Sequence, residues 1–247
     1  MKVVAIIQAR MGSSRLPGKV LMDIAGRSML ARVVERVQRA PGIHEVVVAT
    51  TVAPADDAVA AEAGRLGVTC FRGSEQDVLD RYYQCAQAHA AQVIVRVTAD
   101  CPLLDPEVTG HVVAAFLEHR PDYASNTLER TYPRGLDTEV FSMDALTRAW
   151  REALQPHQRE HVTPYFYENP DVFRLLPVPE TSGGEFSVHR WTVDTPADLE
   201  LVRTVYALLG AEASLSWHQV VALFIHRPHL LEINAHVEQK GFKRVSL

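Results

Sequence analysis

The first 119 residues alternate between short apolar, β-branched runs and amphipathic helical patterns, and this alternation restricts the fold more than any other feature. The apolar runs predict strands at residues 2–8, 44–51, 68–71 and 93–98. Between and after them, the spacing of apolar residues predicts helices at 28–40, 56–66, 77–91 and 106–119. Strands that alternate with helices in this way predict an α/β fold in three layers, with a mostly parallel, twisted sheet covered by helices on both faces.

The loops after the predicted strands are the expected place for a ligand. Ligands of open parallel sheets bind beyond the carboxyl ends of the strands, so the loops after Gln8, Thr51, Phe71 and Thr98 should line one crevice. From about residue 122 the alternation gives way to short apolar pieces, tyrosines and prolines, without a linker. We therefore expect a single domain over residues 1–247, in which about 122–185 elaborate the same core.

Composition excludes several classes of protein. With 47% hydrophobic residues the chain can bury a full core, and its net charge of −5 argues against a general nucleic-acid binder. No run of 18 apolar residues predicts a membrane span, and the apolar N-terminus is too short for a secretory signal. Cys70, Cys85 and Cys101 lack metal-ligand spacing and predict reduced thiols. We expect a cytoplasmic protein with no membrane or nucleic-acid partner.

The segment after the first predicted strand, QARMGSSRLPGK, is the most informative in the chain. Within residues 8–19 it combines two glycines and two serines with the cations Arg10, Arg15 and Lys19. A nucleoside triphosphate carries about four negative charges and needs both main-chain N–H donors and cationic side chains. Gly12 would let the backbone approach the phosphates. On composition alone, a surface turn with incidental cations stays an alternative.

Two common phosphate-binding patterns are excluded. A Walker A loop requires Ser or Thr after its lysine, but Val20 follows Lys19. The G-x-G-x-x-G pattern of dinucleotide-binding folds is absent.

Two acidic residues follow predicted strands. Asp100 comes directly after VIVRVTA, and Asp194 follows a short apolar run that predicts a strand and precedes a helix opened by Pro196. Mg²⁺ is commonly held by one or two carboxylates together with phosphate oxygens and water. Helix capping is the alternative for both residues and is the stronger interpretation for Asp105, which directly precedes Pro106.

Ordered motifs resemble one known family. IIQARMGSSRLPGKVLMDIAG resembles the nucleotide-binding signature of the sugar-activating cytidylyltransferases, which include the CMP-Kdo synthetases and the acylneuraminate cytidylyltransferases. The branch named for spore coat polysaccharide biosynthesis protein F is the most similar. FRGSEQDVLDRYYQCA, VRVTADCPLLDP, YPRGLDTEVF, EHVTPYFYENP and WTVDTPADLELVR resemble segments of that branch in the same order and extend the likeness over most of residues 1–203.

The resemblance implies a Rossmann-type, GT-A-like nucleotidyltransferase that transfers CMP from CTP to a sugar, with Mg²⁺ as cofactor and pyrophosphate as product. It implies an acidic or modified sugar for a surface polysaccharide, and a homodimer built with residues 122–185. It favours Asp100 and Asp194 as the metal-holding pair. The expected catalytic residues are Arg10, Lys19 and Asp100. The expected nucleotide site consists of Gln8, Ala9, Arg10, Gly12, Ser13, Arg15, Lys19, Arg72 and Thr98.

The acceptor sugar is expected to contact Arg134, Asp137, Glu139 and His161, which lie in segments that match the branch. Asp137 and Glu139 are two residues apart and are expected on one side of a strand. Such pairs are also common on exposed strands, and a solitary histidine such as His161 is often structural. Arg96, in an otherwise apolar strand, must meet an anion or a carboxylate.

Three functions remain open on the sequence. The first is the CMP-sugar synthetase. The second is a nucleotidyltransferase for another base, or a GT-A-like glycosyltransferase. The third is a non-catalytic nucleotide-binding protein. The basic loop together with Asp100 and Asp194 favours the first, because this combination suits a triphosphate and the release of pyrophosphate.

Overall fold

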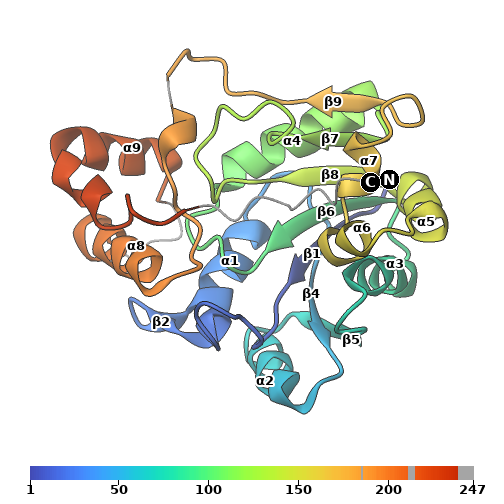
Figure 1. The fold of residues 1–247 in the computed structure, drawn as a ribbon, viewed down its shortest axis with the longest axis horizontal. Coiled ribbons are helices and arrows are strands. Elements are labelled where there is room, and N and C mark those ends of the chain that lie inside the picture. The colour runs from blue at the N-terminus through green and yellow to red at the C-terminus, as the bar shows by residue number, and fades with distance from the viewer. Residues whose placement is uncertain (185, 211–214, 239–247) are drawn as a thin grey trace.

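A twisted seven-stranded sheet forms the centre of the molecule (Figure 1). The computed structural model describes residues 1–184, 186–210 and 215–238. The strands lie in the order β5-β4-β1-β6-β8-β7-β9. β5, β4, β1 and β6 are mutually parallel, β8 runs antiparallel to β6 and β7, and β9 is parallel to β7. The strands are β1 (Val3–Gln8), β4 (Glu45–Thr51), β5 (Thr69–Gly73), β6 (Val93–Thr98), β7 (Tyr123–Ser125), β8 (Glu139–Ser142) and β9 (Leu175–Pro177).

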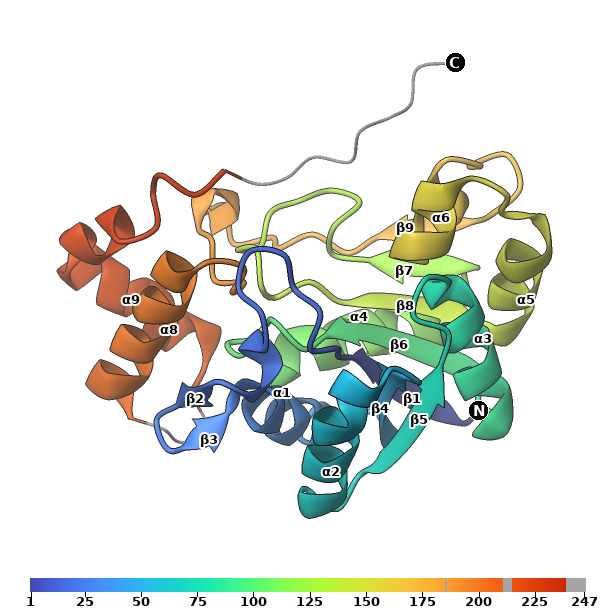
Figure 2. The ribbon, with the colours of Figure 1, turned by 60° about the horizontal axis from the view of Figure 1, so that its bottom comes forward.

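Helices cover both faces of this sheet, which confirms the predicted three-layer α/β fold (Figures 1 and 2). One apolar cluster joins Ile7 to α1 (Met29–Gln38), α2 (Asp57–Arg65) and α4 (Pro106–His119). A second joins Ile6 to α3 (Val78–Ala88), α5 (Met143–Glu152) and α7 (Pro164–Tyr167). Neighbouring residues of β1 face opposite layers because side chains alternate along a strand. α6 (Pro156–His161) packs on α3.

Side-chain caps fix where several helices begin. Ser28 accepts from the Ala31 amide at the start of α1, and Asp77 accepts from the Asp80 amide at the start of α3. Asp105 accepts from the amides of Glu107 and Val108, as predicted for the cap of α4. The Asp105 cap therefore fixes the start of the helix that follows Asp100.

Residues 122–185 add β7, β8 and β9 to the same sheet rather than forming a sheet of their own. Arg96 of β6 lies opposite Glu139 of β8 and forms an ion pair with it, while the Tyr123 hydroxyl donates to the same carboxylate. The expectation that Arg96 meets a carboxylate is thus confirmed.

The C-terminal part packs beside the N-terminal loop. α8 (Pro196–Leu209), α9 (Trp217–His226) and the 3₁₀ turn η4 (Pro228–Glu232) form a third apolar cluster with Trp191 and the hairpin β2 (Asp23–Ile24)–β3 (Arg27–Ser28). Figure 2 shows the loop after β1 rising next to α8. Three further 3₁₀ turns are η1 (Lys19–Leu21), η2 (Pro54–Asp56) and η3 (Phe186–Val188).

Two local predictions were wrong. The run before Asp194 forms no strand. The Trp191 amide donates to the Arg134 carbonyl at 2.7 Å and the Val193 amide donates to the Asp100 carbonyl at 2.8 Å. Because these bonds go to two separate segments, they form no ladder with a neighbouring strand. Asp137 precedes β8, so it does not share a strand with Glu139.

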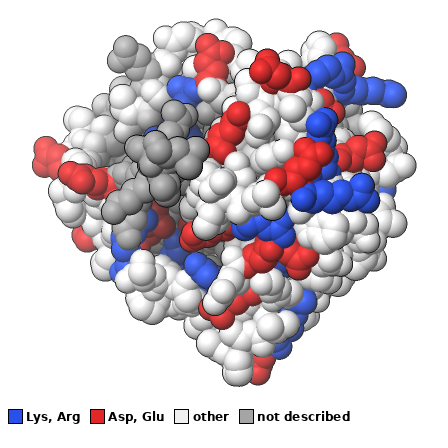
Figure 3. All heavy atoms as spheres, turned by 45° about the vertical axis from the view of Figure 1, so that its right-hand side comes forward, with Lys and Arg blue, Asp and Glu red and all other residues white. Residues whose placement is uncertain are grey.

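The surface of the described part of the chain carries charges of both signs (Figure 3). On the face drawn in Figure 3, the described lysine and arginine side chains are interspersed with aspartate and glutamate. A broad basic face of the kind that tracks nucleic acid does not appear in that view. No helix among the described residues is long and apolar enough to cross a bilayer.

Candidate active site

The predicted phosphate loop starts at the carboxyl end of β1, in the middle of the parallel strands. Gln8 ends β1 and lies opposite Thr98, which ends β6. Residues 9–18 leave the sheet as a loop and lead into η1. The amides of Gly12 and Ser14 have no acceptor among the described residues, so they are free to donate to a ligand.

Asp56 anchors this loop, a role that the sequence analysis missed. Its Oδ1 accepts from the Met11 amide at 2.6 Å, and its Oδ2 accepts from the Thr51 hydroxyl. The Met11 carbonyl in turn accepts from the amides of Ser13 and Gly18, each at 3.0 Å. Asp56 ends η2, within the loop after Thr51 that was expected to line the crevice, so that expectation was the available signal in the sequence.

Of the two loop glycines, Gly18 is the one that the backbone requires. Its φ is +72°, in the left-handed region, and an added Cβ would lie 3.3 Å from the end of Met11. An added Cβ at Gly12 would meet only Arg10, at 3.9 Å. The expected close approach of phosphates at Gly12 stays a prediction.

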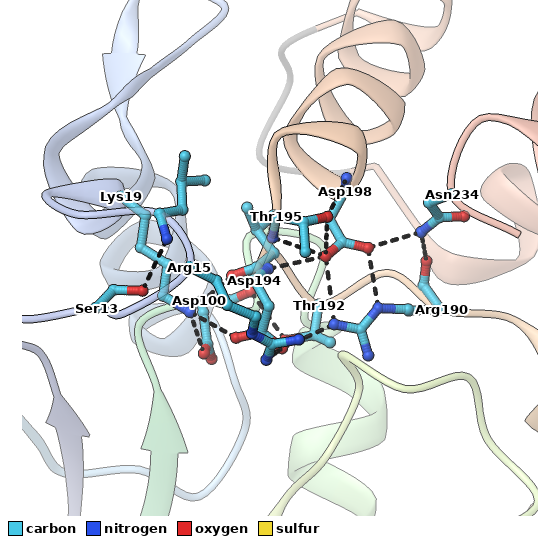
Figure 4. Close-up of polar contacts among 12 residues, drawn as sticks. Ser13, Arg15, Lys19, Asp100, Arg190, Thr192, Asp194, Thr195, Asp198 and Asn234 are labelled. Atoms are coloured by element: carbon cyan, nitrogen blue, oxygen red, sulfur yellow. Dashed lines mark hydrogen bonds and ion pairs between the residues drawn. The ribbon is translucent and has the colours of Figure 1, made fainter. Parts of the chain in front are cut away.

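Lys19 brings the two predicted metal carboxylates together (Figure 4). Its Nζ lies 2.8 Å from Asp100 Oδ2 and 2.9 Å from Asp194 Oδ1, and it donates to the Val193 carbonyl at 2.7 Å. Only 8% of Lys19 is exposed. Burial works against the ammonium form, but the charges of Asp100 and Asp194 outweigh it and raise the pKa of Lys19.

Arginines complete the charge balance around Asp194. Its Oδ2 lies 2.9 Å from Arg15 Nη2 and 2.7 Å from Arg190 Nη2. Although burial favours the protonated acid, Lys19, Arg190 and Arg15 together lower the pKa of Asp194 below 3.8. Asp194 is therefore a carboxylate at neutral pH.

The competing interpretation of Asp194 as a helix cap is excluded. Thr195 caps α8, its side chain accepting from the Asp198 amide, while Asp198 reaches back to the Thr195 amide. This is a capping box, and the T-x-x-D spacing could have identified it from the sequence. The Asp194 side chain is left free to face Asp100.

Two predicted nucleotide residues lie outside the cluster formed by Lys19, Asp100 and Asp194. Arg10 is exposed at the start of the loop. Arg72, in β5, donates to the carbonyls of Thr51 and Ala53 and pairs with Asp57 at 2.6 Å. Its side chain thereby fixes the turn after β4, and its predicted contact with the nucleotide stays a prediction.

The predicted acceptor residues differ in what surrounds them. The backbone of Arg134 pairs with that of residues 189–191, which places Arg134 opposite Arg190. The next residue must be Gly135, because its φ is +111° and an added Cβ would lie 2.8 Å from the Trp191 carbonyl carbon. Arg130, which the sequence analysis missed, holds Asp137 through two hydrogen bonds of 2.8 and 2.9 Å.

Glu139 and His161 are less available than Arg134. Glu139 is 7% exposed and neutralises Arg96. Burial lowers the pKa of His161, so its imidazole is neutral at pH 7. Their substrate roles stay predictions.

Comparison with known proteins identifies the family to which this arrangement belongs. The family model described as cytidylyltransferase matches residues 4–213. The chain belongs to the cytidylyltransferase family. Among individual relatives, the spore coat polysaccharide biosynthesis protein SpsF of Bacillus subtilis is 32% identical over 231 residues, covering 92% of this chain and 95% of that protein.

Solved structures of cytidylyltransferases agree. One from Leptospira borgpetersenii superposes with a TM-score of 0.89 and 32% identity, covering 98% of this chain and 99% of that one. A CMP:2-keto-3-deoxy-manno-octonic acid synthetase complexed with CTP has a TM-score of 0.64 and 25% identity, covering 85% and 100%. The resemblance found in the sequence motifs is confirmed, and the chain is a nucleotidyltransferase of the CMP-sugar synthetase type.

Proposed function

We propose that this cytidylyltransferase transfers CMP from CTP to a sugar, with Mg²⁺ bound by Asp100 and Asp194, and releases pyrophosphate. The observation that carries the proposal is the position of Lys19. A buried ammonium between two carboxylates from separate segments marks a place built for positive charge beside a phosphate-type loop.

The loop supplies what a triphosphate needs. The amides of Gly12 and Ser14 donate hydrogen bonds to phosphate oxygens, and Arg10, Arg15 and Lys19 balance their charge. Gln8 and Thr98 end the two central strands beneath it. Since the Asp56 anchor fixes the start of the loop, these donors are arranged before the nucleotide arrives.

Asp100 and Asp194 fit a magnesium ion by donor chemistry. Their carboxylate oxygens lie 2.8 and 2.9 Å from Lys19 Nζ. The negative charge that attracts this ammonium group would attract a metal cation as well. The described residues hold no group of three or more His, Cys, Asp or Glu side chains suited to a metal. Two carboxylates completed by phosphate oxygens and water is the usual arrangement for Mg²⁺. When bound there, the ion supplies charge neutralisation on the phosphates.

The reaction needs no covalent intermediate with the protein. The sugar hydroxyl gives up its proton to solvent as its oxygen forms a bond to the α-phosphorus. The bond from that phosphorus to the bridging oxygen breaks at the same time, and pyrophosphate leaves. Arg10, Arg15 and Lys19 stabilise the negative charge that grows on the leaving group. The residues of this chain thus act by orientation and electrostatics.

We propose an acidic sugar as the acceptor, because the described part of the structure leaves room for an anion to pair with Arg134. Among the described residues its half-buried guanidinium has no ion-pair or hydrogen-bond partner. Burial and the neighbouring charges of Arg130 and Arg190 outweigh the charge of Asp137 and lower the pKa of Arg134, and a bound anionic group would offset this effect. Arg134 is also close to the carboxylate site, because its backbone pairs with Arg190 and the Arg190 side chain contacts Asp194.

Pyrophosphate release tests the nucleotide assignment. With Mg²⁺ and a panel of acidic and neutral sugars, CTP should support release, while ATP, GTP and UTP should not. Asp100→Asn and Asp194→Asn should each lower kcat by at least about 100-fold. Asp171→Asn, at an exposed position, is the matched control. No release with any nucleotide and acceptor would refute the synthetase.

A second comparison tests the acceptor class. Arg134→Met should raise the KM for the acidic sugar by about tenfold or more and leave the KM for CTP unchanged. Arg151→Met, an exposed arginine of α5, is the control. If only neutral sugars are accepted, the acidic class is wrong while cytidylyl transfer stands.

A further inference from the structure

The C-terminal segment reaches into the carboxylate site through one residue, Asn234. This residue lies beyond residues 4–213, which the family model matches. It follows η4 and is 6% exposed. Its amide nitrogen donates to Asp198 Oδ1 at 2.9 Å and to the Arg190 carbonyl at 3.0 Å. One side chain thus joins the tail to two residues of the site.

Asp198 connects Asn234 to Asp194, because it forms hydrogen bonds with both residues (Figure 4). Its Oδ1 lies 2.9 Å from Arg190 Nε, and its Oδ2 accepts from the amides of Asp194 and Thr195 at 3.0 and 2.9 Å. Asp198 is 1% exposed, so its carboxylate depends on these partners for compensation.

Arg190 is consequently held at both ends. Asp198 fixes its side chain, and Asn234 binds its main-chain carbonyl. The same guanidinium contacts Asp194 Oδ2 at 2.7 Å, the oxygen opposite the one bound by Lys19. The orientation of the Asp194 carboxylate is therefore determined by a chain of hydrogen bonds that begins at Asn234.

The tail is docked firmly enough for such a role. Trp217, Phe224 and Leu230 are buried against the cluster that contains Trp191. The Trp217 amide also donates to Asp105 Oδ2 at 2.8 Å, which ties the start of α9 to the cap of α4.

We propose that Asn234 is a positioning residue for nucleotidyl transfer, acting through Asp198 and Arg190 to orient Asp194. The inference rests on the proposed function in taking Asp194 as a metal ligand. Residues that form hydrogen bonds with a metal-binding carboxylate keep it in the orientation that binds the ion. Loss of one such residue typically weakens metal affinity by about 10-fold to 100-fold.

Titration of the full-length, nucleotide-free protein with Mn²⁺, followed by the EPR signal of the free ion, tests this directly. Asn234→Leu removes both hydrogen bonds at similar volume, and Asn234→Ser is a smaller polar alternative if the first variant folds poorly. Each should weaken Mn²⁺ binding by about tenfold or more. The KM for CTP at saturating Mg²⁺ should stay as in the wild type. Glu232→Gln, exposed in the same segment, should leave both unchanged.

The outcomes separate the two proposals. If Asp194→Asn weakens Mn²⁺ binding but folded Asn234 variants bind it as the wild type does, the role of Asn234 is overturned, even if their melting temperature falls. If Asp194→Asn binds Mn²⁺ like the wild type, the metal assignment fails and this inference fails with it.

Discussion

At the scale of single residues, the proposed site depends on aspartates that hold its backbone in place. Asp56 is 3% exposed and fixes the Met11 amide, from which the phosphate loop departs. Asp56→Ala leaves that amide and the Thr51 hydroxyl without their acceptor. We expect kcat/KM for CTP to fall by about tenfold to 100-fold, because the loop donors lose their alignment. Asp56→Asn, which keeps one acceptor oxygen, should retain more activity.

Steady-state pyrophosphate assays measure this effect. Asp171→Asn, at an exposed position, is again the control for the change of charge. Equal activity of Asp56→Ala and the wild type would show that the anchor has no role in nucleotide binding.

If Asp100 and Asp194 hold the metal ion as proposed, Lys19 competes with that ion for both carboxylates in the nucleotide-free protein. Lys19→Met removes the ammonium that lies 2.8 and 2.9 Å from Asp100 and Asp194. We therefore expect nucleotide-free Lys19→Met to bind Mn²⁺ about tenfold more tightly than the wild type, while its kcat falls. Mn²⁺ EPR measures the affinity, and weaker binding by the variant would contradict the proposed competition.

Asp198 makes stability depend on pH. Burial favours its neutral form, but Arg190, Asn234 and the Asp194 amide outweigh burial and lower the pKa of Asp198 below 3.8. A carboxylate with a lowered folded-state pKa stabilises the fold above its unfolded pKa, and this stabilisation disappears as the pH falls through the folded value.

Asp198→Asn should therefore lower the free energy of unfolding by about 3 kcal/mol near neutral pH. Below about pH 4 the difference from the wild type should begin to shrink, because the carboxyl of the unfolded wild type is then protonated. The difference should disappear as the pH falls through the lowered pKa of the folded carboxyl. Urea unfolding near neutral pH and at about pH 3 provides the comparison. A difference of the same size at both values would contradict the assigned charge.

At the scale of elements, the ion pair between β6 and β8 is structural. Arg96 and Glu139 are register partners, and both are largely buried. Glu139→Gln should lower the free energy of unfolding by about 3 kcal/mol, since it leaves the arginine uncompensated. Arg96→Met combined with Glu139→Met should recover most of that loss.

Denaturant unfolding of the three variants, with the sugar KM of the folded ones, decides the role of Glu139. Unchanged stability of Glu139→Gln together with a raised sugar KM would favour the predicted contact with the acceptor instead.

The elements that could be predicted from the sequence are those with strong periodicity. Residues 93–98 and 106–119 match β6 and α4 to the residue, because each combines an apolar pattern with a defined boundary. The segment before Asp194 could not be predicted, because an apolar run does not reveal whether a neighbouring strand is available. Asp100 was located by its place after a strand, whereas Arg190 and Asn234 are brought to the site by packing of distant segments.

At the scale of the whole molecule, the homodimer implied by the resemblance stays a prediction. Residues 122–185 supply β9, the edge strand of the sheet. The same region contains Leu154, between α5 and α6, which is 83% exposed. Sedimentation equilibrium should give twice the chain mass of 27.5 kDa. A mass equal to one chain at all concentrations would contradict the dimer.

The proposed site draws on segments from both ends of the described chain. The loop after β1 supplies the proposed phosphate donors, the turn after β6 carries Asp100, the segment before α8 carries Asp194, and the tail carries Asn234. The sheet brings the first two together, and the third apolar cluster brings in the others.

A crystal structure with CTP and Mg²⁺ tests this account most directly. It should place the triphosphate against residues 8–19, with the metal ion bound to Asp100 and Asp194 and Lys19 turned toward the phosphates. A triphosphate bound elsewhere, or a metal ion held away from these two carboxylates, would contradict the central claim.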